Sequence, residues 1–486
     1  MKKIILLLLA VSVMLTAVPA LAADGSSYVY DGYTYDFFRN DKSTPAPFIL
    51  ADTLGSANLS GIPLDSVDDV CTTADGRIII VDSRQSRVHI LDSNGKMLAT
   101  LKTIRDEENK IVTLEDGSQL VLNGCQGAFY HEKANEIYIA DTAALRVIVI
   151  DGETYRFKRL ITKPANMTGS TEFRPYKVAV DNADRIYIVV QASYEGIIEL
   201  NEDGSFSRFF GVNEPTINLI DFMWKSIATD AQKAQMSKTF APAFANVALD
   251  GEGFIMAVTM DDASQDSVFR LNFEGKNVLR EMGSVRVIGD MFTDNVSQFV
   301  DIAVKPYGTY AVIDRRMGHI FLYNFDGELL TVFGSTGNLT GQFKTPTAIA
   351  WLGDKLVIGD STLKCVYILE PTDFGQALLD ANEDYYYGNW EDATAHFQEV
   401  LRLCGNLETA YVGIGKNLLM QEKYEDAMYY FKLGNNREFY SKAYKGYRSE
   451  VMRDNFWIIA VVAVLFIGWV LWSEVSYNRK ARRASK

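Results

Sequence analysis

The sequence predicts a six-bladed β-propeller followed by a small helical-repeat domain and one C-terminal transmembrane helix. Three observations carry this prediction. A strand-rich sequence motif repeats six times between residues 67 and 370. A helical motif then recurs at a spacing of 34 residues, and a run of apolar residues lies near the C-terminus. Repeats of this size form single supersecondary units, which bury a continuous core only by stacking or by closing into a ring.

Each copy of the first repeat contains a strand, a tight turn, a second strand that often ends in Asp, and a third strand. The clearest copies span residues 70–92 and 136–151. Equivalent positions in the second strands lie 46 to 69 residues apart: Ile78, Ile137, Ile186, Ile255, Tyr310 and Leu356. A period that stretches only by inserted loops is typical of a propeller, in which each copy is one blade.

The strand-ending Asp and an Arg five residues later resemble the blades of the NHL family. Asp82 with Arg87 and Asp141 with Arg146 keep this spacing. The other copies depart from the pattern at one of its two positions: Val190, Thr259, His319 and Cys365. We interpret the pair as structural, because a carboxylate that accepts turn amides and faces an Arg holds a hairpin in place.

The sixth copy ends early, because Pro371 and a helical pattern follow its third strand. Residues 47–54 are expected to supply the missing outer strand, with Ile49 at the blade interface, and so to close the ring without an open sheet edge. Residues 28–38 are expected to form a hairpin around Asp31 and Gly32, since Asp-Gly supports the positive φ angles of a type I′ turn.

One insertion separates the third and fourth copies. Residues 215–240 place apolar side chains at helical spacing, which predicts a helix or helix pair over one propeller face. This insertion has three possible roles that the sequence leaves open. It could form a lid over a ligand, protrude toward a partner, or cover apolar surface of the blades.

The two ends of the chain predict the location of the propeller. Residues 1–22 combine a basic start, an apolar stretch and a small-residue cleavage site, which indicates a bacterial secretory signal peptide. The apolar run at 456–472 has the minimum length of a transmembrane helix, and the tail at 473–486 is basic. By the positive-inside rule this tail is cytoplasmic, so we expect a single-pass type I membrane protein with its bulk outside the cytoplasm.

The helical domain is expected over residues 372–454, after a propeller that occupies 23–371. A motif of an aromatic residue, Ala and Phe occurs in it twice: Trp390, Ala393 and Phe397, then Tyr424, Ala427 and Phe431. Its spacing of 34 residues resembles that of tetratricopeptide repeats, which implies a concave groove for a peptide or protein. A plain spacer between propeller and membrane is the alternative.

Composition narrows the partners. The chain has 48 basic and 62 acidic residues, and the signal peptide would remove two of the basic ones. We expect no nucleic-acid partner, because phosphate contacts require a basic surface. The spacing of the four cysteines is not that of a metal site. Cys71 and Cys125 either form a disulfide across adjacent blades or remain buried thiols. For Cys365 and Cys404 the sequence indicates no disulfide partner.

The propeller mouth is the remaining candidate site. The sequence lacks a Gly-x-Ser-x-Gly elbow, a P-loop and a dinucleotide fingerprint, and its four histidines lack metal-type spacing. Where the inner strands converge, the residues before their apolar anchors offer two carboxylates, an amide and an ammonium group: Asp69, Lys177, Asn246 and Asp301. This set suits a cation or a polyhydroxyl ligand, or is ordinary hydrated rim.

Two resemblances bear on function. Gluconolactonase-like propellers hold a divalent metal at their mouth, which implies Ca²⁺ on Asp69, Asn246 and Asp301 and a lactonase-type hydrolase, although Lys177 would repel the ion. The domain combination resembles membrane-anchored NHL propellers of Gram-positive bacteria, which implies protein partners among carbohydrate-import components. We expect a binding or scaffold protein without catalytic residues, metal or cofactor, and the metal-dependent hydrolase is the alternative.

Overall fold

The computed structural model describes most of the chain. The described residues are 32–169, 171–190, 193, 195–211, 243–260, 266–283, 285–290 and 296–484. The expected signal peptide, the expected helical insertion and the first half of the expected N-terminal hairpin lie outside them. The chain divides into two compact units, Met1–Tyr387 and Gly388–Lys486.

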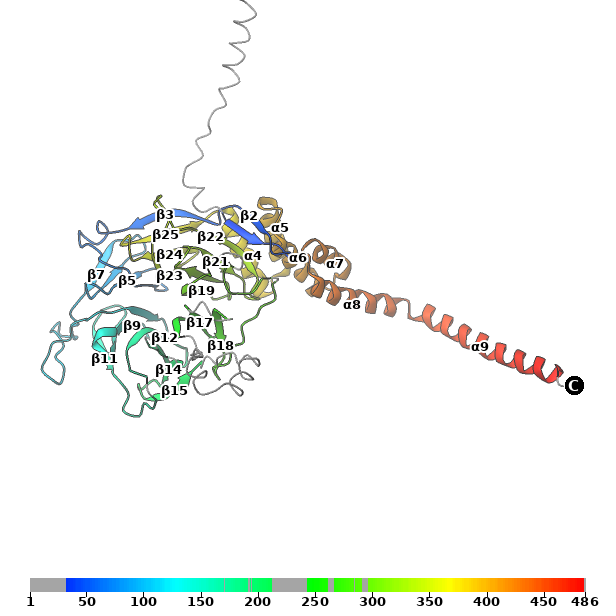
Figure 1. Ribbon diagram of the computed structural model, residues 1–486, viewed down its shortest axis with the longest axis horizontal. Coiled ribbons are helices and arrows are strands. Elements are labelled where there is room, and N and C mark those ends of the chain that lie inside the picture. Colours follow the sequence, from blue (N-terminus) through cyan, green and yellow to red (C-terminus); the bar gives the residue numbers. More distant parts are fainter. Residues whose placement is uncertain are drawn as a thin grey trace, which may run out of the picture. The chain divides into compact units, whose positions relative to one another are not determined.

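The described part of the first unit forms six antiparallel sheets, the blades of a propeller (Figure 1). Blades one and two contain β4 (Asp69–Thr72), β5 (Ile78–Asp82), β6 (Arg87–Leu91) and β7 (Met97–Leu101), then β8 (Gly127–His131), β9 (Glu136–Asp141), the short 3₁₀ helix η2 (Thr142–Ala144), β10 (Arg146–Asp151) and β11 (Phe157–Ile161). Blades three and four contain β12 (Pro175–Val180), β13 (Ile186–Val190), β14 (Ile197–Leu200) and β15 (Phe206–Phe210), then β16 (Phe244–Leu249), β17 (Ile255–Thr259) and β18 (Val268–Leu271). Blades five and six contain β19 (Phe299–Val304), β20 (Tyr310–Asp314), β21 (Ile320–Tyr323) and β22 (Leu329–Phe333), then β23 (Pro346–Leu352), β24 (Lys355–Asp360) and β25 (Cys365–Pro371).

The second strand of each blade lies between two neighbouring blades, which explains its sequence. In β5, β13, β17 and β20 every residue is buried. A strand covered on both faces has no solvent side, so it is a continuous apolar run and does not alternate. The apolar second strands that define the repeat are therefore the layers of the core between blades.

The ring closes through β3 (Phe48–Leu54), the outer strand of blade six. It pairs antiparallel with β25, from Leu54 opposite Val366 to Phe48 opposite Pro371. The segment is the one that the sequence assigns to this place, but Ile49 is only half-buried. Phe48 is instead the fully buried anchor, and its ring stacks on Phe333 of blade five at a centroid distance of 5.3 Å.

An N-terminal hairpin adds two strands to the sheet of blade five, a position that the sequence does not predict. Strand β1 (Gly32–Tyr35) pairs with β22 and with β2 (Asp41–Thr44), so the turn of this hairpin lies at residues 36–40, and Gly32, which is expected in a turn, lies in a strand. A Cβ on Gly32 would lie 2.6 to 2.9 Å from atoms of Thr44, Val332 and Thr331. This glycine therefore permits close strand contact and does not form a turn.

Helix α4 (Asp373–Tyr387) groups with the propeller in the first unit, which ends at Tyr387. The hydroxyl of Tyr385 donates to Asp326 at 3.0 Å, and that of Tyr386 donates to Glu252 at 3.1 Å. These hydrogen bonds join the helix to loops of the propeller, which explains why it does not group with the later helices.

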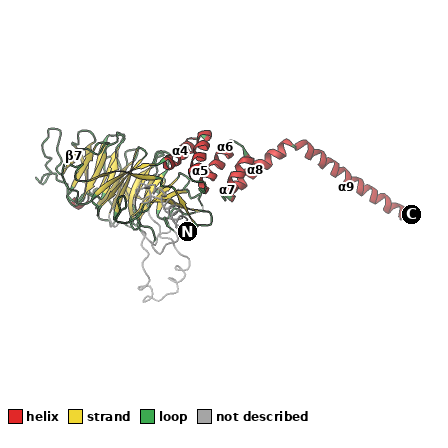
Figure 2. Cartoon of the chain, turned by 90° about the horizontal axis from the view of Figure 1, so that it is seen from above, coloured by secondary structure: helices red, strands yellow, loops and turns green. Residues whose placement is uncertain are grey.

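The second unit contains only helices among its described residues (Figure 2). They are α5 (Trp390–Leu403), α6 (Glu408–Met420), α7 (Tyr424–Leu433), α8 (Arg437–Asp454) and α9 (Phe456–Ala484). Helices α5 to α8 pack in chain order. The motif residues Phe397 and Phe431 are buried against α6, where a Cβ on Gly413 would lie 2.6 Å from the first ring and one on Gly415 would lie 2.7 Å from the second. The two copies of the motif thus form the seam between helices.

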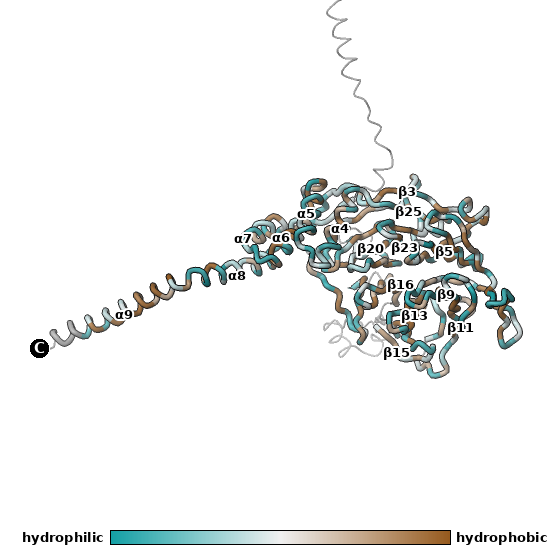
Figure 3. The backbone as a smooth tube through the Cα atoms, turned by 180° about the vertical axis from the view of Figure 1, so that it is seen from behind, coloured by the Kyte–Doolittle hydropathy of each residue, from teal (hydrophilic) through white to brown (hydrophobic). Residues whose placement is uncertain are grey.

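Helix α9 is long and apolar enough to cross a membrane. Its segment Phe456–Asn478 has 23 residues and contains an 18-residue window with a mean hydropathy of 2.4, none of which is buried within the structure. Figure 3 shows this stretch as an apolar part of α9. The helix begins where the expected apolar run begins and continues past Trp472.

Candidate functional site

The inner strands bring the predicted polar residues together at the propeller axis. Asp69, Lys177, Asn246 and Asp301, which we call the axial ring, line one cavity and are 4, 2, 7 and 3% exposed. In β12, β16 and β19 a register shift directly precedes the ring residue. A β-bulge of this kind redirects a side chain, which explains how three of the four residues leave the blade core and face the axis.

Asp69 and Lys177 form a buried ion pair. Lys177 Nζ lies 2.6 Å from Asp69 Oδ1 and donates to the carbonyl oxygen of Asp68 at 3.1 Å. The other carboxylate oxygen, Asp69 Oδ2, accepts from Ala128 N at 2.8 Å. Burial is the largest single influence and lowers the pKa of Lys177, but the charges of Asp69, Tyr176 and Asp301 together raise it by more, so the lysine is protonated at neutral pH.

Asp301 and Asn246 form the other half of the ring. Asp301 Oδ1 accepts from Asn246 Nδ2 and from Ile302 N, the latter at 2.7 Å, and its Oδ2 accepts from Ile349 N at 2.7 Å. Asn246 Oδ1 accepts from Val247 N at 2.7 Å, so both neighbours require the same orientation of the amide. Burial raises the pKa of Asp301 to about 7, Lys177 opposes this rise, and the charge of Asp69 adds to it.

The axial ring does not fit the Ca²⁺ site that the gluconolactonase resemblance implies. Ca²⁺ takes six to eight oxygen ligands. Here Asn246 turns its NH₂ group, not its oxygen, toward Asp301, and an ammonium group neutralises Asp69. An ion would have to displace these hydrogen bonds and approach Lys177, because Asp69 pairs with Lys177 and Asp301 pairs with Asn246.

Two cavities lie along the axis. The inner cavity, of about 230 Å³, is lined by the axial ring and by the residues that follow it on the inner strands. The mouth cavity, of about 370 Å³, is lined by residues that precede the ring on these strands, including Asp68, Gln126 and Tyr176, and by the exposed Arg315. The ring thus lies between the two cavities, and the mouth cavity offers polar, aromatic and charged groups, among them Gln126, Tyr176 and Arg315.

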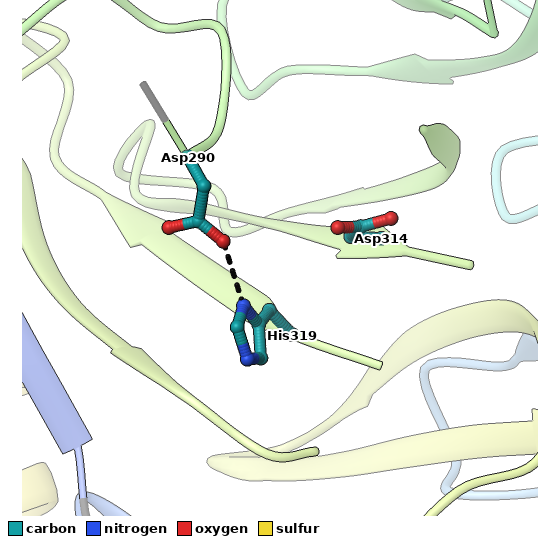
Figure 4. Close-up of side chains that lie close together, drawn as sticks. All are labelled: Asp290, Asp314 and His319. Carbon is teal, nitrogen blue, oxygen red and sulfur yellow. Dashed lines mark hydrogen bonds and ion pairs between the residues drawn. The ribbon is translucent and has the colours of Figure 1, made fainter. Parts of the chain in front are cut away.

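A second polar cluster lies in blade five and was missed by the sequence analysis. Ligand-type atoms of Asp290, Asp314 and His319 all lie within 4.8 Å of one another (Figure 4). His319 Nδ1 is 2.8 Å from Asp290 Oδ2. Asp290 lies in a connection far from the other two in sequence, so no local spacing indicates it. In the sequence, the feature that could have indicated this cluster is His319, which occupies the position of the Arg in the repeat.

Cys71 and Cys125 are free thiols and do not form a disulfide. All four cysteines are unpaired, and all lie in the described part of the chain. Burial raises the pKa of the Cys71 and Cys125 thiols, and it raises the pKa of Cys365 to about 11. Neutral, largely buried thiols act as small apolar groups of the core.

Comparisons with known proteins show the fold alone. A streptogramin B lyase is 13% identical with a TM-score of 0.41, over 66% of this chain and 97% of that chain. A hydrazine synthase from Kuenenia stuttgartiensis is 10% identical with a TM-score of 0.40, over 64% of this chain and 96% of that chain. The β-propeller domain of Myceliophteria thermophila Cps50 (Swd1) is 11% identical with a TM-score of 0.40, over 66% of this chain and 99% of that chain. No protein-family model matches the chain, and no curated protein matches it.

Proposed function

We propose that this protein is a membrane-anchored binding or scaffold protein whose propeller lies outside the cytoplasm. The internally paired axial ring carries the proposal. Because Asp69 pairs with Lys177 and Asp301 with Asn246, these groups are not free to bind a catalytic metal or to act on a substrate. We therefore expect a partner to bind at the mouth cavity, at the outer surfaces of the blades or at the helical unit.

The anchor of the proposed protein is α9. Its apolar segment is followed by a basic tail, which favours a cytoplasmic C-terminus, and the signal-like residues 1–22 favour export of all that precedes the helix. A single-pass type I topology follows from these two features together.

A protein is the partner that the architecture favours. The blade pattern is NHL-like, and the seam formed by Phe397 and Phe431 with Gly413 and Gly415 supports helical hairpins of the tetratricopeptide type. Helical repeats bind peptides and proteins. The resemblance to anchored propellers of Gram-positive bacteria directs the search for this partner to components of carbohydrate import.

The test uses the full chain in membranes of its host. A tagged chain is crosslinked, purified and compared with a version lacking residues 388–454, in which a partner of the helical unit should be lost. Recovery of the same proteins from both versions, or of none from the full chain, would refute the role of the helices.

The hydrolase alternative has its own test. The purified chain is assayed on simple lactones with and without Ca²⁺, beside Asp301→Ala. We expect neither hydrolysis nor a rise in melting temperature with Ca²⁺. Activity or stabilisation that requires Ca²⁺ and disappears in Asp301→Ala would replace the scaffold proposal by the lactonase-type one.

A further inference from the structure

The Asp that ends the second strand of a blade normally has partners for both carboxylate oxygens. In blade six, Asp360 Oδ2 accepts from Lys344 N at 2.6 Å, and its Oδ1 accepts from Leu363 N at 2.8 Å. In blade two, Asp141 Oδ1 accepts from a backbone amide, and its Oδ2 accepts from Arg146 Nε at 2.7 Å. These residues show what the position needs, namely backbone amides or a cation on each oxygen.

Blade five departs from this rule. Asp314 Oδ1 accepts from Gln298 N at 3.0 Å and from Arg316 N at 2.8 Å, but its Oδ2 is buried without a hydrogen-bond partner. The residue is fully buried. A buried carboxylate oxygen without a hydrogen-bond partner is costly, so a cation bound at this oxygen would stabilise the folded protein.

Two side chains of types that ligate metals, Asp290 and His319, lie close to Asp314. His319 stands at the position that Arg146 occupies in blade two, but its Nδ1 turns to Asp290 Oδ2. Asp290 is buried, and no Lys or Arg of the described chain pairs with Asp290 or with Asp314. Where blade two has the permanently charged Arg146, blade five therefore has His319 and a second carboxylate, Asp290.

We propose that Asp290, Asp314 and His319 bind one divalent transition-metal ion, with Zn²⁺ as the best fit. Two carboxylate oxygens and an imidazole nitrogen are a ligand set that Zn²⁺ accepts at about 2.0 to 2.2 Å. Ligands at that distance in a tetrahedron around one ion lie roughly 3.3 to 3.6 Å apart. Atoms already within 4.8 Å reach this geometry by small inward rotations of their side chains.

The surroundings of the site hold the ligands in place. The hydroxyls of Tyr33 and Tyr35 both donate to Asp290 Oδ1, the second at 2.9 Å, which leaves Oδ2 directed at His319. Burial and the Asp290 charge raise the pKa of both tyrosines, so both remain donors. Outer partners that orient a ligand in this way are usual around protein metals. The ion would take the place of the missing arginine and link β1 to blade five through these hydrogen bonds.

The test uses the full chain in detergent, stripped of metal with a chelator and titrated with Zn²⁺ by calorimetry. We expect one ion per chain and a rise in melting temperature that the chelator reverses. Asp314→Asn and His319→Gln should each weaken binding by more than about a hundredfold, since even the loss of an outer partner costs about 10- to 100-fold. His89→Gln changes a buried histidine of blade one that contacts Thr100, and it should bind Zn²⁺ like the wild type.

Co²⁺ provides a second readout that separates this site from the thiols. Bound Co²⁺ should show a ligand-field spectrum without a thiolate charge-transfer band, and Asp314→Asn should remove the spectrum. Asp314→Asn should also leave the metal-free protein folded, because it removes an uncompensated buried charge. Absence of stoichiometric binding, a thiolate band, or binding that survives both ligand variants would overturn the proposal.

Discussion

Lys177 Nζ lies 2.6 Å from Asp69 Oδ1 and so joins blade three to blade one across the propeller axis. Asp69 also accepts from the backbone of Ala128 in blade two, so three blades meet at one carboxylate. Because this carboxylate connects three blades, we expect the loss of its contacts to destabilise the whole propeller.

Replacing Lys177 with Met should destabilise the propeller by roughly 3 to 5 kcal/mol, because it leaves Asp69 buried without its counter-ion. Denaturant unfolding measures the change. Lys364→Met is the control, because Lys364 pairs with Asp65 where both side chains are nearly half-exposed, and it should cost about 1 kcal/mol or less. Equal effects of the two substitutions would contradict the central role of the axial pair.

The contribution of Asp301 to the stability of the propeller should fall as the pH rises from about 4 to 7. The pKa of Asp301 is raised to about 7 in the folded protein, above the unfolded value of about 3.9, so the folded state holds the proton more tightly in this range. The loss is at most about 1.4 kcal/mol per pH unit. Asp301→Asn cannot titrate, so the difference between wild type and variant should vary with pH only in this window. A flat difference would show that Asp301 is ionised throughout.

Ring closure should depend on Phe48. Phe48→Ala removes a fully buried ring that stacks on Phe333, and it should cost about 3 to 5 kcal/mol in one cooperative transition. Phe38→Ala is the matched control, because Phe38 is 69% exposed and its loss should stay within about 0.5 kcal/mol. A separate early transition in Phe48→Ala would mean that β3 frays independently of the blades.

The helical unit should be sensitive to a single methyl group. Gly413→Ala places a Cβ 2.6 Å from the ring of Phe397 and should destabilise the unit by about 1 to 3 kcal/mol, measured as loss of helical circular dichroism in urea. A Cβ on Gly405 would meet only one atom, at 3.6 Å, so Gly405→Ala should be tolerated. If both variants unfold at the same urea concentration, the helices do not pack through this seam.

Protease added to intact cells or protoplasts should digest the propeller and leave a C-terminal membrane fragment. The reason is the proposed orientation of α9, with its basic tail inside the cell. Removing residues 456–486 should release the protein into the medium. Protection of the propeller until the membrane is lysed would reverse the proposed topology.

The sequence alone determined the propeller, its six blades, the helical region and the apolar helix. These features are periodic and local: a second strand buried on both faces must be apolar, as in Ile78–Asp82, and a span must be a long apolar run, as in Phe456–Asn478. The four residues of the axial ring also follow from the repeat, because equivalent positions of a closed ring face one axis.

Only the tertiary structure decided what these residues do. Register shifts before Lys177 and Asp301 set which side chains meet at the axis, and the resulting pairing replaces a cation site with an ion pair and an amide contact. The cluster of Asp290, Asp314 and His319 depends on a connection between blades that carries no periodic signal. Contacts between residues distant in sequence form only when the ring closes, and their geometry depends on bulges and loops that residue patterns do not encode.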